Sequence, residues 1–349
     1  MKKNSNVSII IPTYNRAHLI GRAIKSVLNQ TYQDFELIIV DDGSTDNTED
    51  IIRQFQEKDK RIRYIKHDKN KGGSAARNTG IKNSVGKYIA FQDSDDEWLP
   101  KKLEKQIEII KCTDPKVGIV YSDMFKIYTK NIKYFYSPII MPKDKIIYKK
   151  ALDYGVVNIG IGTALIKKIC FSKVGIFDEE FSRLIDLEFF IRLSKYYYFY
   201  HIKEPLVKYY DTDMAISKNN YSLIVARKLI LKKYFRDITK NKKILAKHYL
   251  LIAESLCINE EIKKGESYFK KAFMVYPNLK KEKKLLYMHY FIIGYELCMN
   301  NKLIEGRKFL LKAIKVNPFL IKYSLVFLLT FFGNGSFRKI IQIYQNFKK

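Results

Sequence analysis

Four acidic side chains fall within five consecutive positions of the chain, at Asp93, Asp95, Asp96 and Glu97. They follow directly after an apolar run at residues 88–91 that is typical of a buried strand. Like charges at this spacing repel one another, so a folded protein keeps them together where a cation neutralises them. In an extended chain, Asp93 and Asp95 face the same side and can share one divalent ion, while Asp96 points away. Carboxylate oxygens suit Mg²⁺ or Mn²⁺, and these ions keep room for phosphate oxygens.

The acidic cluster taken alone leaves a second interpretation open. In that interpretation the cluster is a solvated turn, and Asp96 caps a helix that begins at Trp98. The residues that precede the cluster are needed to choose between the two.

The preceding elements must position this cluster, and their apolar patterns alternate between two periods. Strand-like runs occupy residues 7–11, 35–40, 61–67 and 88–91, and the stretches between them carry apolar residues at helical spacing. Strand, turn and helix therefore alternate, which predicts a parallel sheet covered by helices. Ligands of such sheets bind beyond the carboxyl ends of the strands, so we expect the polar turns after these strands to converge on one crevice.

Four segments of this region together resemble glycosyltransferase family 2, whose members have the GT-A fold and use nucleotide-sugar donors. The segments are VSIIIPTYNR at 7–16, IVDDGSTDNT at 39–48, GGSAARNTG at 72–80 and GKYIAFQDSDDEW at 86–98. Weaker agreement continues to about residue 220. The resemblance implies an α/β domain over residues 1–220, with a Rossmann-like, mostly parallel sheet flanked by helices.

The resemblance also implies a nucleotide-sugar site at the ends of the first two strands. Pro12, Thr13, Tyr14 and Asn15 would line it, with the Tyr14 ring offered to the base. Asp41 would accept a hydrogen bond from the imide N–H of uracil or thymine, because an ionised carboxylate only accepts. The implied donor is therefore a UDP-sugar or a dTDP-sugar.

The turn that begins at Asp41 has a second interpretation. Asp42 and Gly43 are typical of a tight turn, and Ser44 or Asp46 can cap the helix that follows. Both interpretations can hold together, with Asp41 kept for the base.

Further residues follow from the same resemblance. Arg77 would face the nucleotide or its diphosphate. Asp93, Ser94 and Asp95 would form the D-x-D element of the family: Asp93 and Ser94 contact the nucleotide sugar, and Asp93 and Asp95 hold a divalent metal, Mn²⁺ or Mg²⁺, that bridges the diphosphate.

The catalytic base implied by the resemblance is Asp186. The family has a Glu-Asp pair before an aromatic-rich helix, and this chain has Ile185-Asp186 there, so the first acid is missing. Asp186 alone carries the role, and Glu188 is a less favoured substitute. The implied reaction is a single displacement with inversion, in which Asp186 takes a proton from a hydroxyl of a glycan or lipid-linked acceptor. Aspartate is also common at helix N-caps, and the local sequence leaves that alternative open.

The missing acid favours one alternative from another class of protein. In it, the chain is a catalytically inactive transferase fold that acts as a helical-repeat scaffold in a glycan-assembly complex.

The last third of the chain carries an internal repeat of 41 residues. Residues 248–259 align with residues 289–300. The same offset joins three further pairs: Gly265 with Gly306, Ala272 with Ala313, and Pro277 with Pro318. Each unit reads as helix, turn and helix, which resembles a tetratricopeptide-type pair and must stack on its neighbour to bury its apolar face. We therefore expect an all-α region over residues 221–349, with two such repeats and with the small residues at close helix contacts.

The net charge of +28 is concentrated in this helical region. Residues 221–349 carry 27 basic and 8 acidic side chains, whereas residues 1–220 carry 37 and 28. Such a surface favours a polyanion, first of all anionic lipid. The chain has no arginine-rich stripe or zinc finger, so we expect no nucleic acid partner.

The sequence also bears on where in the cell the protein is located. No run approaches the roughly 20 apolar residues of a membrane span, and no leader precedes the first strand. The four cysteines lack paired zinc spacing and read as reduced thiols. We expect a cytoplasmic protein that lies peripherally on the inner face of the plasma membrane.

Overall fold

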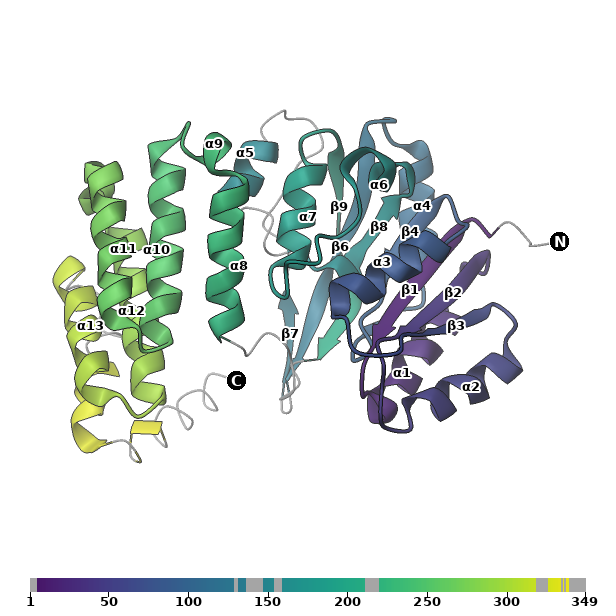
Figure 1. Ribbon diagram of the computed structural model, residues 1–349, viewed down its shortest axis with the longest axis horizontal. Coiled ribbons are helices and arrows are strands. Elements are labelled where there is room, and N and C mark those ends of the chain that lie inside the picture. The colour runs from purple at the N-terminus through teal and green to yellow at the C-terminus, as the bar shows by residue number, and fades with distance from the viewer. Residues whose placement is uncertain are drawn as a thin grey trace. The chain divides into compact units, whose positions relative to one another are not determined.

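The computed structural model describes residues 5–128, 131–135, 147–153, 159–210, 220–317, 326–333, 335 and 337–338. The chain divides into two compact units, Met1–Ala215 and Ile216–Lys349. The first unit is built of strands and helices and the second of helices (Figure 1).

The described strands of the first unit form one sheet in the order β3-β2-β1-β4-β8-β6-β9-β5, with β7 paired to β6. The strands are β1 (Val7–Thr13), β2 (Phe35–Asp41), β3 (Ile62–Lys66), β4 (Tyr88–Phe91), β5 (Glu97–Trp98), β6 (Val117–Tyr128), β7 (Asn131–Phe135), β8 (Ala164–Lys167) and β9 (Tyr198–Tyr210). Strands β1 to β4 pair in parallel, as predicted. Beyond them the sheet is mixed: β6 and β9 are parallel, but β8, β7 and β5 pair antiparallel. The purely parallel part of the sheet therefore ends at β4, whose other neighbour is the antiparallel strand β8.

Helices cover both faces of this sheet. They are α1 (Ala17–Leu28), α2 (Thr48–Lys58), α3 (Gly73–Asn83), α4 (Lys102–Cys112), α5 (Ile147–Leu152), the 3₁₀ turn η1 (Ile161–Thr163), α6 (Ile169–Val174) and α7 (Ile185–Leu193). Successive β1 side chains point to opposite faces. Ile9 and Ile11 join a core with apolar residues of α1, α2 and α4. Ile10 faces α3, which approaches so closely that a Cβ on Gly80 would lie 2.4 Å from the Ile10 side chain.

The strand register brings the predicted site together. Thr13 at the end of β1 lies opposite Asp41 at the end of β2, and Ile10 of β1 lies opposite Phe91 at the end of β4. The carboxyl ends of these three strands therefore meet at one edge of the sheet, as predicted from the alternation of strands and helices.

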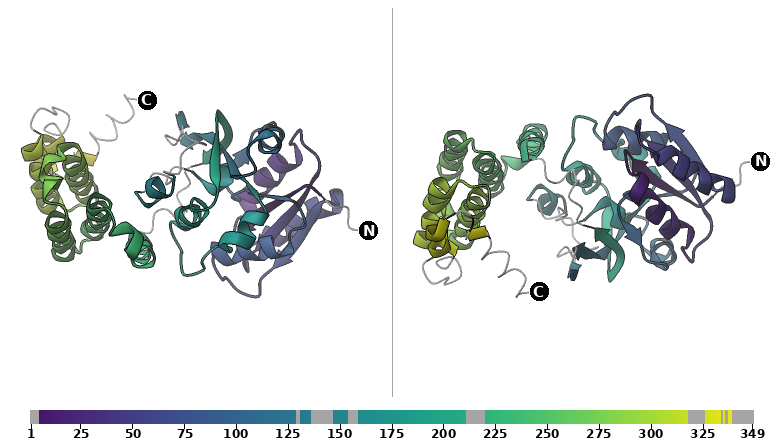
Figure 2. Two further views of the ribbon diagram at one scale, coloured as in Figure 1. Left: turned by 90° about the horizontal axis from the view of Figure 1, so that it is seen from above. Right: turned by 90° about the horizontal axis from the view of Figure 1, so that it is seen from below.

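The second unit consists of helices whose bounds repeat. They are α8 (Asn220–Lys233), α9 (Phe235–Ile238), α10 (Lys242–Ile258), α11 (Ile262–Val275), η3 (Pro277–Lys281), α12 (Lys283–Met299), α13 (Leu303–Val316) and η4 (Thr330–Phe332). The bounds of α12 and α13 are those of α10 and α11 moved by 41 residues. The left-handed residues before the second helix of each pair, Glu260 and Asn301, repeat at the same offset. Figure 2 shows these helices nearly end-on, side by side.

Small residues allow close contact within each helix pair. A Cβ on Gly265 would lie 2.3 Å from Cys257 Sγ, and a Cβ on Gly306 would lie 2.3 Å from Cys298 Sγ. This agrees with the packing role predicted for these glycines. Over the described residues, none of the helices has both the length and the apolar character that crossing a bilayer requires.

Candidate active site

The acidic cluster forms a tight turn at the end of β4. The amide of Asp96 donates to the carbonyl oxygen of Asp93 at 3.1 Å, which closes a turn over residues 93–96. The extended geometry expected from the sequence is therefore wrong here, and so is the expected direction of Asp96: its side chain lines the same pocket as Asp93. Nor does Asp96 cap a helix, because its Oδ1 accepts from the amide of Tyr210 at 3.0 Å and Lys101 is the N-cap of α4.

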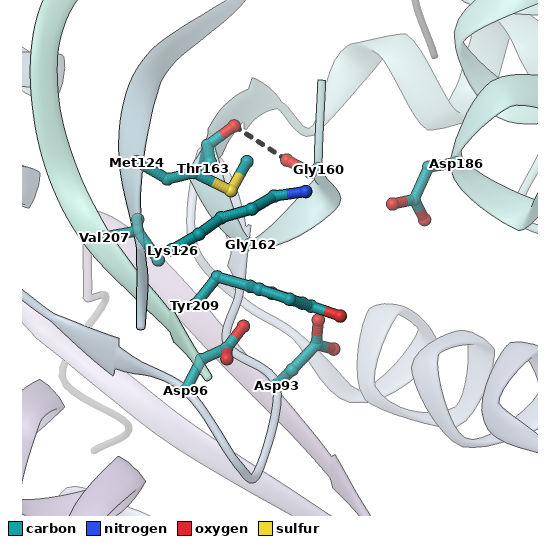
Figure 3. A pocket seen from close by; sticks show the side chains of 10 residues that line it. All are labelled: Asp93, Asp96, Met124, Lys126, Gly160, Gly162, Thr163, Asp186, Val207 and Tyr209. Carbon is teal, nitrogen blue, oxygen red and sulfur yellow. Dashed lines mark hydrogen bonds between the residues drawn. The ribbon is translucent and has the colours of Figure 1, made fainter. Parts of the chain in front are cut away.

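A pocket of about 200 Å³ lies beside this turn (Figure 3). Its lining comes from the turn, β6, η1 with the residue before it, α7 and β9, and consists of Asp93, Asp96, Met124, Lys126, Gly160, Gly162, Thr163, Asp186, Val207 and Tyr209. In Figure 3, Asp186 reaches toward the pocket from α7, on a different side from the turn that carries Asp93 and Asp96. The fold therefore brings the predicted base to the predicted D-x-D element.

Two cross-strand pairs contribute to the pocket lining. On the parallel neighbours β6 and β9, Met124 lies opposite Val207 and Lys126 lies opposite Tyr209. Lys126 Nζ is 5.6 Å from the centroid of the Tyr209 ring. The sequence alone predicts no role for Lys126 or Tyr209. Side chains two positions apart on a strand share a face, so Lys126 lies on the same face of β6 as Met124, and Tyr209 on the same face of β9 as Val207. This signal is visible only once β6 is known to extend to Tyr128.

Burial and mutual repulsion make the ionised forms of the carboxylates in the acidic turn unfavourable. Burial, and then the charge of Asp93, raise the pKa of Asp95. Burial also raises the pKa of Asp96 well above its ordinary value, and the charges of Asp93 and Asp95 add to this. Arg77 Nη2 donates to Asp93 Oδ1 at 2.7 Å and offsets part of the negative charge. The remainder favours a bound cation.

These carboxylates fit a divalent cation that a nucleotide diphosphate helps to hold. Among the residues that the structure describes, no three or more His, Cys, Asp or Glu side chains are grouped so as to hold a metal by themselves. Mg²⁺ commonly binds through one or two carboxylates together with substrate phosphates and water, and Mn²⁺ takes similar oxygen ligands. Asp93 and Asp95 stay the predicted ligands, and Asp96 joins Asp93 at the pocket as a further candidate.

Asp186 lies in the first turn of α7 and is held by a segment distant in sequence. Its Oδ2 accepts from the amide of Ile161 at 2.9 Å. The N-cap of α7 is Leu184, in a left-handed conformation with φ 56°, so Asp186 is not an N-cap. Burial raises the pKa of Asp186 to about 6; the charge of Arg77 lowers it, the charge of Asp93 raises it, and the Ile161 amide lowers it. A carboxylate with this pKa is ionised at neutral pH and still basic enough to accept a proton.

Glu188, the alternative base, is committed to an ion pair. It is 1% exposed, and its two carboxylate oxygens accept from Nε and Nη2 of Arg192, each at 2.8 Å. The same guanidinium donates to the carbonyl oxygen of Ile176 at 2.9 Å. Arg192 therefore ties α7 to the segment before it, and its partner Glu188 is not among the residues that line the pocket.

The residues predicted to bind the nucleotide lie at the carboxyl edge of β1 and β2. Pro12 and Thr13 stand opposite Val40 and Asp41 in the register. Tyr14 follows and is 41% exposed, so its ring is accessible to a base.

Side chains tie together the turns that follow β1 and β2. Asn15 is left-handed with φ 50°, and its Oδ1 accepts from the amide of Thr45 at 2.8 Å. The amide of Asn15 in turn donates to Ser44 Oγ at 2.9 Å. Asp46 Oδ1 accepts from the amide of Thr48, the first residue of α2, at 3.1 Å. The N-cap of α2 is nevertheless Asn47, so the expectation that Ser44 or Asp46 caps this helix is wrong, although Asp46 contacts its first residue.

Asp41 is fully buried and already has two donors. Its Oδ1 accepts from the amide of Ser44 at 2.8 Å, and its Oδ2 accepts from the hydroxyl of Tyr64 at 2.8 Å. Asp41 therefore supports the turn itself, together with Gly43, whose φ is +81°. Each carboxylate oxygen has a second lone pair, so an imide N–H would have to reach Asp41 beside one of these donors.

Several buried polar atoms near this edge lack a partner. Within the described ranges, no hydrogen bond is made by Thr13 Oγ1, by either polar atom of the Gln92 amide, or by Arg77 Nε. Ser94, in the acidic turn, is 8% exposed. Buried polar atoms are generally paired with protein, water or ligand, so this edge has unused capacity for a polar ligand or bound water.

Comparisons with known proteins agree with this geometry. The model of the family described as Glycosyl transferase family 2 matches residues 8–175. An uncharacterised glycosyltransferase of Rickettsia typhi is 34% identical over 259 residues, which are 71% of this chain and 78% of that protein. The Escherichia coli protein WfgD, named as a UDP-Glc:alpha-D-GlcNAc-diphosphoundecaprenol beta-1,3-glucosyltransferase, is 40% identical over 158 residues, 45% of this chain and 57% of that protein. An uncharacterised glycosyltransferase of Rickettsia bellii is 50% identical over 109 residues, 31% of this chain, and the chain spans only 16% of that relative.

Two solved structures share the fold. S. aureus TarS in complex with UDP-GlcNAc aligns over 87% of this chain and 87% of that one, with a TM-score of 0.53 and 17% identity. The mannosyltransferase PcManGT from Pyrobaculum calidifontis, in complex with GDP-Man and Mn²⁺, covers 94% of this chain and 81% of its own, with a TM-score of 0.52 and 16% identity. These likenesses confirm the predicted fold class, a GT-A-like sheet with flanking helices followed by a helical region. The family match and the Rickettsia typhi relative show that the chain belongs to glycosyl transferase family 2.

Proposed function

We propose that this chain is an inverting glycosyltransferase that moves a sugar from a UDP-sugar, or a dTDP-sugar, to a hydroxyl of a glycan or lipid-linked acceptor. The observation that carries the proposal is the pocket that Asp186 shares with Asp93 and Asp96. A carboxylate with a pKa of about 6 lies there, together with the turn at which a diphosphate and its cation would bind.

The substrate classes are supported by the relatives. WfgD is named for a UDP-Glc donor and a diphosphoundecaprenol-linked acceptor, and TarS was solved with UDP-GlcNAc. PcManGT was solved with GDP-Man, so the fold by itself does not select the base. Asp41 is the residue in this chain to which we assign that selection.

The proposed reaction is a single displacement. Asp186 removes the proton from the acceptor hydroxyl while that oxygen forms a bond to the anomeric carbon. The bond from that carbon to the diphosphate breaks on the opposite side, so the configuration inverts. General-base assistance of this kind contributes about 10²–10⁴-fold in rate. Arg77, which donates to Asp93 at 2.7 Å, keeps positive charge where the leaving group becomes more negative.

Asp93 and Asp95 are the residues that we propose to hold Mn²⁺ or Mg²⁺. When bound, the metal supplies positive charge that stabilises the leaving diphosphate. The raised pKa values of Asp95 and Asp96 and the Mn²⁺ in the PcManGT structure support this assignment.

Calorimetry with UDP, with and without Mn²⁺, tests the proposal on the full chain. We expect Mn²⁺ to tighten UDP binding about tenfold or more, which is about 1.4 kcal/mol, and Asp93→Asn to abolish that gain. Asp59→Asn is the matched control. Asp59 is also an aspartate that pairs with an arginine, Arg61, but it lies just before β3, at the opposite end of the strands from the acidic turn. A screen of UDP-sugars for Mn²⁺-dependent hydrolysis then identifies the donor. Metal-independent or absent UDP binding contradicts the proposal.

The second candidate function is an inactive transferase fold that serves as a scaffold in a glycan-assembly complex. The observation that favours it is Ile185, which stands where the family has an acid next to the base. The same calorimetry separates the two, because a scaffold has no need of metal-dependent UDP binding.

We further infer that the protein lies on the inner face of the plasma membrane, where lipid-linked acceptors are accessible. The basic excess of residues 221–349 supports this. So do three exposed apolar side chains, Leu328, Phe331 and Phe332, which are 56%, 60% and 67% exposed. We also infer that the pairs α10–α11 and α12–α13 are tetratricopeptide-like units that bind a partner or the acceptor.

A further inference from the structure

A buried polar network joins α4 to the turn η1. Lys102, the first residue of α4, is fully buried. Its Nζ donates to Gln106 Oε1 at 2.7 Å and lies 4.0 Å from the centroid of the Trp98 ring. Burial lowers the pKa of Lys102 well below its ordinary value. A lysine in such a place costs free energy that an apolar side chain would not, so its presence calls for a physical reason.

Lys102 orients the amide of Gln106, which is also fully buried. Because Gln106 Oε1 accepts from Lys102, Nε2 faces the other way and donates to two backbone carbonyls. These are Val120 O at 3.0 Å and Thr163 O at 2.8 Å. Trp98 Nε1 donates to Gly162 O at 3.1 Å. Side-chain donors therefore hold two consecutive carbonyl groups of η1.

The same turn reaches the catalytic groups. The Ile161 amide donates to Asp186 Oδ2 at 2.9 Å, and Gly162 and Thr163 line the pocket. A Cβ on Gly162 would lie 4.0 Å from Asp93 Oδ2. Thus η1 touches Asp186 on one side, lies next to Asp93 on another, and is held by Trp98 and Gln106.

We propose that Gln106 and Trp98 are positioning residues for the base. By holding the carbonyl groups of Gly162 and Thr163, they keep the amide of Ile161 directed at the Asp186 carboxylate. A three-residue 3₁₀ turn has poor internal hydrogen-bond geometry, so it needs such external support. The inference rests on the proposed function, in which Asp186 must be placed against an acceptor hydroxyl. A misplacement of about 1 Å can cost about 10²-fold in rate.

The chain offers a matched control in Gln30. It is 1% exposed, and its Nε2 also donates to two carbonyls, those of Ser26 at 3.1 Å and Leu99 at 2.9 Å. Its Oε1 accepts from the amide of Leu103 at 3.0 Å. Gln30 therefore resembles Gln106 in burial and bonding, but it ties α1 to the start of α4 and not to η1.

The test compares Gln106→Leu with Gln30→Leu in the full chain. We expect both variants to have a lower Tm, and only Gln106→Leu to lose about 10- to 100-fold in kcat with the Kd for UDP unchanged. Trp98→Phe removes one donor and keeps a ring beside Lys102, so it should fold and lose kcat in the same way with a smaller change. Equal losses in Gln30→Leu, or a wild-type kcat in both Gln106→Leu and Trp98→Phe, would overturn the inference.

Hydrogen exchange tests the same idea without activity. The amides of residues 161–163 should exchange faster in Gln106→Leu and in Trp98→Phe than in the wild type, whereas Gln30→Leu should leave them unchanged. If the wild-type chain transfers no sugar, the proposed function fails while this measurement still decides whether η1 depends on the network. Unchanged exchange in both variants refutes the positioning role.

Discussion

Asp186 combines burial with contacts that partly compensate for it. One backbone amide donates to it, and the charge of Arg77 favours its ionised form, but burial and Asp93 raise its pKa to about 6. A group with this pKa is mostly deprotonated at pH 7 and remains a useful base. The environment that raises the pKa of Asp186 therefore makes its charge unfavourable in the folded state.

Asp186→Asn should abolish transfer while keeping nucleotide binding. Asparagine preserves an acceptor for the Ile161 amide but cannot take the acceptor proton, so we expect kcat to fall at least about 100-fold with the Kd for UDP unchanged. Glu188→Gln is the control: it weakens the ion pair with Arg192 and should lower Tm without a comparable loss of kcat. Transfer retained in Asp186→Asn would remove this residue from the role of base.

The pH dependence of the reaction should report the same group. Because the ionised form of Asp186 is the base in the proposed reaction, kcat/KM should decline as the pH falls through about 6, with one proton bound per inactivated molecule. Initial rates at low substrate concentration between about pH 5 and 8 measure this. A profile that stays flat down to pH 5 contradicts the assignment.

Asp186→Asn should also stabilise the protein at high pH. A raised folded-state pKa means that ionisation is less favourable in the folded than in the unfolded chain, so the cost is fully present above about 6 and is absent below the unfolded pKa. We expect the variant to have a higher Tm than the wild type at pH 8, and a similar Tm at pH 4. A difference in Tm that does not change with pH would show that the charge of Asp186 is not its source.

The sequence predicts part of this residue-scale picture. It identifies Asp93 and Asp186, which the fold does bring to one pocket. The predicted direction of the Asp96 side chain is wrong. The amide of Asp96 donates to the carbonyl oxygen of Asp93, which turns the backbone and ends the alternation of side-chain directions on which the prediction depended. Asp41 accepts hydrogen bonds from the Tyr64 hydroxyl and from the Ser44 amide. The contact with Tyr64 depends on the pairing of β2 with β3.

At the scale of elements, the second unit is built from a helix pair that occurs twice. The offset of 41 residues is visible in the sequence and recurs in the bounds of α10 to α13. The repeat could be predicted because each copy must place the same small residues at the same contacts. The short β5 could not, because its partner β9 comes much later in the chain. Nor could the extension of β6 to Tyr128, which pairs both with β7, directly after it, and with the distant β9.

Gly265→Ala should destabilise the helical unit. A methyl group there would lie 2.3 Å from Cys257 Sγ, and overpacking costs about 1–3 kcal/mol, against about 1 kcal/mol gained in helix propensity. Cys257→Ala removes the sulfur atom and should restore part of the stability of Gly265→Ala. Gly306→Ala with Cys298→Ala is the equivalent pair in the second copy. Denaturant unfolding measures both, and additive losses in the double variants would contradict the contact.

At the scale of the whole molecule, charge and exposed apolar side chains predict membrane binding. Each Lys or Arg near an anionic surface contributes about 1 kcal/mol, and residues 221–349 have 27 basic side chains against 8 acidic ones. We expect the full chain to float with vesicles that contain phosphatidylglycerol, but not with neutral phosphatidylcholine vesicles. Binding should weaken as salt rises from about 0.05 to 0.5 M, because the Debye length shortens.

Two variants distinguish insertion of apolar side chains into the membrane from attraction between opposite charges. Phe331→Ser with Phe332→Ser removes two of the exposed rings of η4 and should reduce binding to anionic vesicles. Met274→Ser, at a site in α11 that is 79% exposed, should not. If both variants bind anionic vesicles equally well, the interaction depends on charge alone. If the wild type does not float with anionic vesicles at low salt, the protein does not bind membranes through this helical region.

The lining of the pocket comes from two separate stretches of the chain. Asp93 and Asp96 belong to the first hundred residues, which also form the edge of β1 and β2, whereas every other lining residue falls between positions 124 and 209. On the proposed function, the carboxylates that hold the metal and the base that meets the acceptor hydroxyl are therefore encoded in consecutive blocks. A chimaera that takes residues 117–210 from another family member should inherit that member's acceptor while keeping its own nucleotide, so new linkages can arise by recombination within a single gene.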